Sequence, residues 1–192
     1  MVYVLMDSNA YVDGSILYEY DSIHADQVEW YTAQIKSLAD VYTGGDTSSL
    51  PSIAMWHIAC KEYQMAYDEH VNGGGEWLDI GENEELEEYV SEPAYPDTDT
   101  IFEAIRGLGS TKMILVGHDH YNSFGAKYKG VYLCYGLAAD FISYAAWDPD
   151  FESKTEFRGG TLLLTGDDSS VRLIQDRYVG EDTSLSLDGL WA

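Results

Sequence analysis

The sequence has few basic residues and no long apolar run. Lysine and arginine together number 10 against 34 aspartates and glutamates, which gives the 192-residue chain a net charge of −24. Affinity for nucleic acid phosphates and anionic lipid surfaces comes mainly from lysine and arginine, so we expect no nucleic acid partner. No segment approaches the roughly 20 consecutive apolar residues that cross a bilayer, and we expect no membrane span.

Cysteine is also scarce. Cys60 and Cys134 are the two cysteines, too few for a disulfide framework, and we predict that both are small buried side chains. The N-terminus has neither a basic segment nor a small-residue cleavage site, so we predict no signal peptide. The sequence therefore assigns the chain to no compartment.

The residues that are present predict an α/β fold. Short apolar runs, which are typical of buried strands, alternate with segments of helical periodicity. The predicted strands are residues 2–6, 53–56, 113–116, 131–135, 161–165 and 171–175, and the predicted helices are residues 25–39 and 100–106.

Two segments are predicted to lie outside the core. Residues 71–96 combine three consecutive glycines with an acidic block, a composition typical of a mobile insertion with at most a short helix. Residues 179–192 are polar, and we expect a loosely held tail after a domain formed by residues 1–178.

Two of the predicted strands lead directly into histidine. His57 follows residues 53–56, and the motif Gly117-His118-Asp119-His120 follows residues 113–116. Open α/β sheets place their sites just beyond the carboxyl ends of strands, and neutral imidazole is a good ligand for zinc, iron or manganese. The pattern therefore predicts metal ligands at His57, His118 and His120.

Neighbouring residues can support such a site. We expect Gly117 to let the backbone turn sharply at the end of the strand. Asp119 or Asn122 can orient a ligand imidazole by hydrogen bonding to its second nitrogen.

The same residues allow other interpretations. A histidine that ends a strand is often a hydrogen-bonded structural residue, and three polar residues after a buried strand need partners in any case. Cys60 together with His57, His118 and His120 would make a closed structural zinc site. His24 and His70 are interpreted as surface residues. A serine hydrolase is not indicated, because the chain has no G-x-S-x-G motif, and its glycine run lacks the lysine of a phosphate-binding loop.

The order of these motifs resembles that of the calcineurin-like metallophosphoesterases, in particular their purple-acid-phosphatase-like branch. The similarity extends over about residues 2–175. The matching stretches are Val4–Ser8, Asp26–Tyr31, Met55–Ile58, Lys61–Tyr63, Gly117–Asn122, Leu133–Gly136 and Arg158–Gly160.

The resemblance implies a fold, a cofactor and a reaction. The fold would be half of a metallophosphatase β-sandwich flanked by helices, with a mixed sheet. The cofactor would be two divalent or mixed-valence ions (iron, zinc or manganese), with His57 and His118 on one ion and His120 on its neighbour. The reaction would be hydrolysis of a phosphorylated substrate.

The sequence also departs from the family pattern. None of the motifs D-x-H, G-D-x-x-D and G-N-H-D/E, which supply the other ligands in that family, precedes His57 as the family order requires, and Ala59 replaces a proline. We therefore expect the chain to correspond to the C-terminal half of the domain and to have little activity alone. Its exposed sheet would pair with the missing N-terminal half or with itself. The alternative is a non-catalytic, acidic binding module on the same fold.

Overall fold

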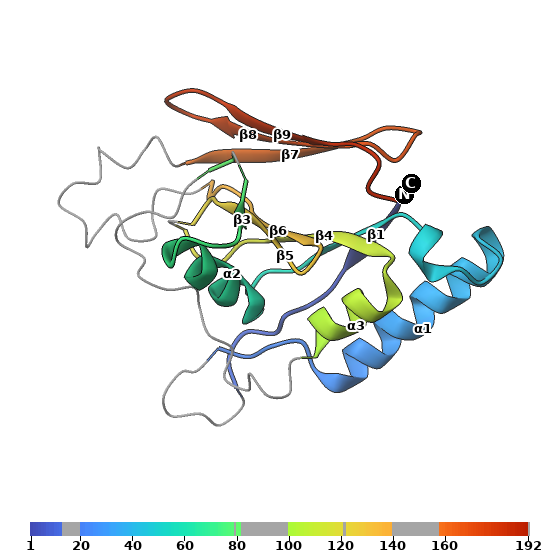
Figure 1. The fold of residues 1–192 in the computed structure, drawn as a ribbon. Helices are drawn as coiled ribbons and strands as arrows, with labels where there is room; N and C mark the ends of the chain where they lie inside the picture. Colours follow the sequence, from blue (N-terminus) through green and yellow to red (C-terminus); the bar gives the residue numbers. More distant parts are fainter. Residues whose placement is uncertain (13–19, 79, 82–99, 121, 140–157, 192) are drawn as a thin grey trace.

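The protein is built in three layers. The computed structural model describes residues 1–12, 20–78, 80–81, 100–120, 122–139 and 158–191. A six-stranded sheet forms the middle layer, helices cover one of its faces, and a three-stranded antiparallel sheet covers the other (Figure 1). This arrangement confirms the predicted α/β class. In the described ranges, no helix has the length and apolar character that a membrane crossing requires.

The six-stranded sheet is mixed, in the order β1-β2-β4-β6-β5-β3. The first four strands in this order run parallel to one another. β5 is antiparallel to β6, and β3 is antiparallel to β5. The strands are β1 (Val2–Leu5), β2 (Ser52–Met55), β3 (Glu76–Trp77), β4 (Thr111–Val116), β5 (Gly125–Tyr128) and β6 (Val131–Tyr135). The continuous apolar runs of β2, β4 and β6 are explained by burial on both faces, since helices cover one side and the second sheet covers the other.

The helices bury one side each against this sheet. The helices are α1 (Ala25–Tyr42), α2 (Glu62–Val71) and α3 (Ile101–Leu108), and a 3-10 turn occupies Thr47–Ser49. α1 places Tyr31, Ile35 and Ala39 in the core at intervals of four residues, which is the spacing of one helix face. The two helices predicted from the sequence are confirmed: α1 ends three residues later than predicted, and α3 begins one residue later and ends two residues later.

Two apolar clusters hold the layers together. Neighbouring residues of one strand belong to different clusters: Ala54 and Ile114 face the helices, while Ile53 and Met113 face the three-stranded sheet. This alternation follows from the period of two along a strand. Both cysteines are buried, as predicted, and neither forms a disulfide.

The three-stranded sheet corrects the prediction of a loose tail. Its strands are β7 (Gly159–Thr165), β8 (Val171–Arg177) and β9 (Thr183–Leu187), in that order. β9 lies within the predicted tail, where Leu185 and Leu187 belong to the cluster between the sheets. Trp191 packs on the same cluster, and its indole N–H donates a hydrogen bond of 2.5 Å to the Ser110 carbonyl. Alternating leucines anchor this segment despite its polar composition.

Part of the predicted insertion also belongs to the core. Residues Glu76–Trp77 form β3, which pairs with β5, and Leu78 and Ile80 are buried between the sheets. Gly81 follows in a left-handed conformation (φ 66°), where an added Cβ would lie 1.8 Å from the Ser123 carbonyl oxygen. Residues 78, 80 and 81 are therefore tightly packed. Residues 82–99, which contain most of the acidic block, lie outside the described residues.

Candidate metal centre

Three neighbouring parallel strands deliver polar loops to one end of the sheet. β1 leads to Asp7, β2 leads to His57, and β4 leads to His118. Backbone contacts tie these loops together, because the Gly117 N–H donates to the His57 carbonyl (3.0 Å) and the Ile58 N–H donates to the buried Ser8 hydroxyl (2.9 Å). The histidines are thus fixed by the strand register and not by free loops.

Two imidazole nitrogens converge at this position. Nδ1 of His118 lies 3.3 Å from Nε2 of His57, and the two rings are nearly perpendicular (87°) with centroids 5.1 Å apart. Two nitrogens bound tetrahedrally at ~2.0–2.1 Å from one zinc ion would be about 3.3–3.4 Å apart. The same separation fits a direct hydrogen bond when one ring carries its proton on the facing nitrogen.

His120 lines the same cavity as this pair. The cavity has a volume of about 190 Å³, and residues 136–139 form its other wall together with Gly117 and Asp119. The buried guanidinium of Arg158 donates a hydrogen bond to the His120 carbonyl and fixes the backbone there. All three predicted ligands therefore border one space. No set of three or more His, Cys, Asp or Glu side chains converges on a common point within the described ranges.

The electrostatics keep one of these imidazoles neutral. Burial lowers the pKa of His118 below its ordinary value, and His57 and His120 act in the same direction against the opposing effect of Asp119. A neutral imidazole is the form that binds a metal ion, so the pair is suited to that role at neutral pH.

The sharp turn at the end of β4 occurs at His118, not at Gly117. His118 has φ 74°, while Gly117 is not among the residues with positive φ. A residue other than glycine in this region is disfavoured, and such strain gathers at functional sites. The prediction that the backbone turns sharply at Gly117 was therefore wrong by one residue. A Cβ on Gly117 would lie 3.4 Å from His57 Nδ1, which is an ordinary van der Waals contact.

Asp119 and Asn122 both point into the protein. The Tyr135 hydroxyl donates a 2.5 Å hydrogen bond to Oδ2 of Asp119, and both side chains are buried. Asn122 is buried as well, and its backbone N–H donates to the Asp119 carbonyl (3.0 Å). Asp119 therefore anchors the histidine loop to β6. An orienting role toward an imidazole stays a prediction for both residues.

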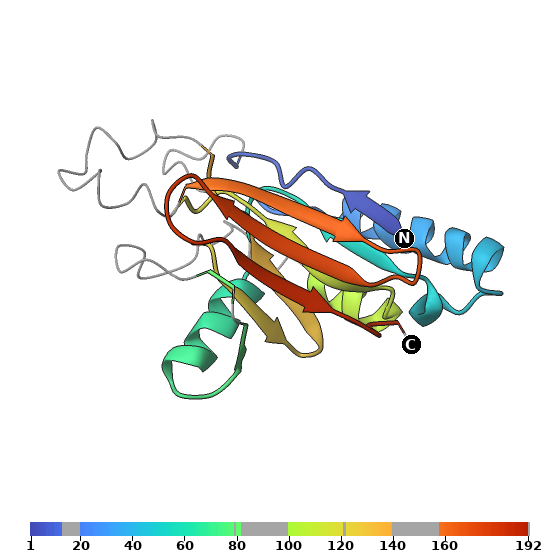
Figure 2. The same cartoon turned by 90° about the horizontal axis from the view of Figure 1, so that it is seen from above.

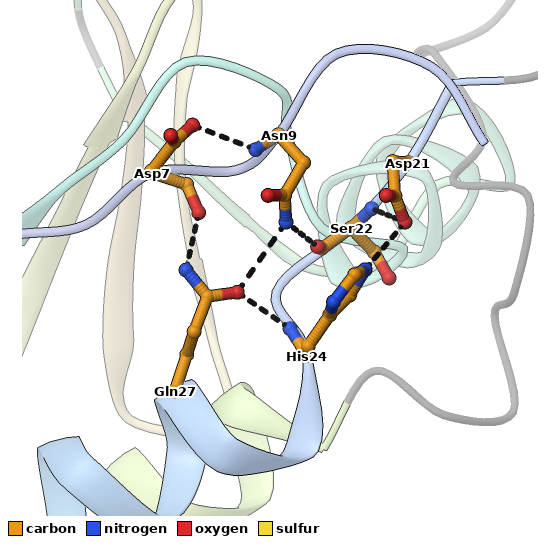
Figure 3. A network of polar contacts seen from close by, with 6 residues as sticks. All are labelled: Asp7, Asn9, Asp21, Ser22, His24 and Gln27. Atoms are coloured by element: carbon orange, nitrogen blue, oxygen red, sulfur yellow. Dashed lines mark hydrogen bonds and ion pairs between the residues drawn. The ribbon is translucent and has the colours of Figure 1, made fainter. Parts of the chain in front are cut away.

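A polar network holds the loop after β1 against α1 (Figure 3). The Gln27 amide donates to the Asp7 carbonyl (2.7 Å) and accepts from the His24 backbone N–H (2.8 Å), which satisfies an otherwise open donor at the helix start. The Asn9 amide donates to the Ser22 carbonyl (2.8 Å). The network joins the two ends of the loop, residues 7–9 and 21–24.

This loop carries an aromatic side chain that the sequence did not identify. The Tyr20 ring contacts the His118 ring edge to face, with centroids 4.3 Å apart, and Tyr11 stacks beside Tyr20 at 5.4 Å. No motif marks Tyr20, because its position depends on loop pairing between residues 11 and 20. Tyr20 packs against the His118 ring and limits its movement.

The other histidine and cysteine interpretations are resolved by position. Cys60 lies in the cluster between the sheet and the helices, and the described residues contain no three-donor group that includes it. The closed zinc site was therefore a wrong alternative for this part of the chain. His24 is exposed and contacts Asp21 (2.8 Å), while exposed His70 stacks on Trp77 at 4.0 Å. Both are surface residues, as predicted.

The fold and the site together define a class: an α/β protein with histidines at the carboxyl edge of a parallel sheet. Two Arabidopsis thaliana proteins are similar to the chain. "Probable inactive purple acid phosphatase 29" is 26% identical over 148 residues, which cover 74% of this chain and 35% of that protein. "Probable inactive purple acid phosphatase 14" is 27% identical over 145 residues, which cover 73% and 33%.

The chain is thus distantly similar to the purple-acid-phosphatase-like proteins of the calcineurin-like metallophosphoesterase superfamily. It spans about a third of the length of these curated relatives. No family model matches the chain, and no solved structure matches it.

Proposed function

We propose that the chain is the metal-binding C-terminal portion of a calcineurin-like phosphoester hydrolase, and that it has little or no hydrolytic activity alone. His57 and His118 would share one ion and His120 would face a second, within a complete site that binds two iron, zinc or manganese ions. The observation that carries the proposal is the 3.3 Å separation of His118 Nδ1 and His57 Nε2 at the end of the sheet.

The donor set of the pair suits a transition metal. Two neutral imidazoles prefer zinc, copper, nickel or iron over magnesium or calcium, which favour oxygen ligands. A bound ion would supply a Lewis acid and an acidified water molecule. The residues of this chain would hold the ion, and Tyr20 and Asp119 would keep the His118 ring and its loop in place.

The same geometry explains the expected lack of turnover. Stable binding of two divalent ions needs more ligands than three imidazoles, and a carboxylate usually bridges the pair. The described ranges hold no group of three or more candidate ligands. A substrate phosphate would also meet a chain of net charge −24, so local cations are required to offset repulsion.

A second candidate function is a non-catalytic binding module on the same fold. The specific observation in its favour is that both relatives are named as probably inactive purple acid phosphatases. In that case the His57–His118 contact would be a hydrogen bond that stabilises the loops, and neither histidine would need a metal ion.

Metal titration separates the two candidates. Calorimetry with Zn²⁺ on the purified apo-chain should give one ion per chain, and His57→Ala or His118→Ala should weaken binding by at least about tenfold. His70→Ala is the matched control, because it removes an exposed histidine that stacks on Trp77 away from the pair. Equal zinc binding by wild type, H57A and H118A would rule out this metal site.

Activity is tested separately. The purified chain loaded with Zn²⁺, Mn²⁺ or Fe²⁺ should not hydrolyse an aryl phosphate above the level of H118A. Metal-dependent turnover by the wild-type chain that is abolished in H118A would overturn the prediction of an inactive chain, while leaving the metal site supported.

A further inference from the structure

We infer that the open edge of β7 is a self-association surface, at which two copies of this chain pair antiparallel and form a continuous six-stranded sheet. The surface consists of the outward residues Leu162 and Leu164 on β7, together with Tyr3 and Leu5 on β1. The inference is independent of the proposed metal site.

Each of the two sheets ends in an edge strand on the same side of the molecule. β1 ends the six-stranded sheet and β7 ends the three-stranded sheet. The hydroxyls of Tyr3 and Thr165 are 2.5 Å apart and join the two strands across the layers. Seen from above, β1 and β7 run along the same margin (Figure 2). At the start of β7 the Gly159 N–H donates to the Ala138 carbonyl (3.1 Å), and in the described part of the chain the rest of β7 pairs as a strand with β8 alone.

Apolar side chains are exposed along this margin. Leu162 and Leu164 are 47% and 48% exposed, Tyr3 is 44% exposed, and Leu5 is 72% exposed. The outward residues of β9, at the far edge of the same sheet, are Ser184 and Ser186. One edge of the three-stranded sheet is thus apolar on its outer face and the other is polar.

The usual protection of an edge strand is missing here. Exposed edges normally carry charges, proline or bulges that prevent pairing with another chain. Charged residues make up 23% of the chain, yet β1 (VYVL) and β7 (GGTLLLT) contain none. The opposite edge of the large sheet is protected, because β3 has two residues and its Glu76 contacts Lys127 (3.4 Å).

Charge favours a second copy at this place. A two-fold contact sets each patch against itself, so any net charge in the patch repels its own copy. With a net charge of −24, two copies repel each other, and an uncharged strand adds nothing to this repulsion. Pairing centred on Leu163 would place Leu162 of one copy beside Leu164 of the other on the same face.

Sedimentation velocity over a range of chain concentrations tests the inference. A reversible dimer is expected, and it should tighten when salt is raised from about 0.1 M to about 1 M, because screening weakens the repulsion between two acidic chains. The double variant L162K/L164K should weaken dimerisation at least tenfold.

The control is S184K/S186K, which adds the same two charges to the same face at the β9 edge. It should dimerise like wild type, and both variants should keep the wild-type far-ultraviolet circular dichroism, since all four side chains are exposed or half-exposed. A monomer at every concentration and salt, equal weakening by both variants, or dimerisation that survives L162K/L164K would each overturn the inference.

Discussion

Nε2 of His57 and Nδ1 of His118 lie 3.3 Å apart although the two residues are 61 positions apart in the chain. The contact follows from the register of two parallel strands, in which Met55 pairs with Leu115. Two residues beyond that pair, the Gly117 N–H binds the His57 carbonyl and brings the loops together. The histidine pair is therefore a consequence of sheet pairing, which explains why both residues follow buried apolar strands.

His118→Asn should separate strain from metal binding. Asparagine tolerates the left-handed conformation that His118 adopts (φ 74°), so we expect a free energy of unfolding within about 1 kcal/mol of wild type. Zinc binding should be lost, because the converging nitrogen is gone. Urea denaturation and calorimetry measure the two effects.

His118→Val is the contrasting variant. A β-branched residue at this φ is strongly disfavoured, so it should be less stable than the asparagine variant by about 1–2 kcal/mol. Equal stability of the two variants would show that the backbone at position 118 relaxes at no cost.

Gly81→Ala should be far more destabilising than Gly44→Ala. Both glycines are left-handed, with φ 66° at position 81 and φ 65° at position 44. An added Cβ at position 81 would lie 1.8 Å from the Ser123 carbonyl oxygen, whereas an added Cβ at position 44 would have no neighbouring atom within 4 Å. We expect a cost of about 1 kcal/mol at position 44 and about 3 kcal/mol or more at position 81. Urea denaturation of both variants measures the difference, and similar costs would mean that residues 80–81 are loosely packed.

Apolar runs were sufficient to predict the parallel strands. β2, β4 and β6 are buried on both faces and β1 on one, and each is a continuous hydrophobic segment that stands out in the sequence. β3 was missed because a strand of two residues, Glu76–Trp77, has no measurable period. β9 was missed because T-S-L-S-L is half polar, and its alternation becomes informative only when β8 lies beside it.

The candidate site was predicted in part for the same reason. His57, His118 and His120 follow strands, so their approach to one cavity could be expected. Tyr20 and the Arg158 contact with the His120 carbonyl depend on tertiary packing of segments far apart in sequence, which no local pattern encodes. The left-handed turn at His118 was assigned to Gly117 because glycine is the residue that adopts it most readily.

Trp191 should contribute to stability although it lies in a polar segment. Its indole packs on the cluster between the sheets and donates to the Ser110 carbonyl (2.5 Å). We expect Trp191→Ala to lower the free energy of unfolding by about 2–3 kcal/mol, and Trp191→Phe by about 1 kcal/mol, since phenylalanine keeps the ring and loses the donor. Chemical denaturation measures the stability of both variants. An unchanged stability in W191A would indicate that the end of the chain is loosely held.

Buried tyrosines should make the fold sensitive to alkali. Burial raises the pKa of Tyr31 from 10.0 to about 12, against a smaller opposing effect of its hydrogen bond with Thr111 (2.8 Å). Below pH 10 the phenol is neutral in both the folded and the unfolded chain, and its contribution to stability is fully present. Between pH 10 and pH 12 the unfolded chain ionises first, so this contribution, about 2–3 kcal/mol, is lost as the pH rises.

Tyr31→Phe isolates this effect. The variant should be less stable at neutral pH by about 1 kcal/mol, because the Thr111 hydroxyl loses its hydrogen bond with Tyr31 and keeps the one with Ser52 (2.7 Å), but its stability should fall less steeply above pH 10. A residual decline is expected, because burial also raises the pKa of Tyr63 and of Tyr135. Tyr42→Phe, which alters a tyrosine that is 72% exposed, is the control and should follow the wild-type profile. If urea denaturation gave parallel profiles for wild type and Y31F from pH 9 to pH 12, the Tyr31 phenol would be accessible to solvent in the folded chain.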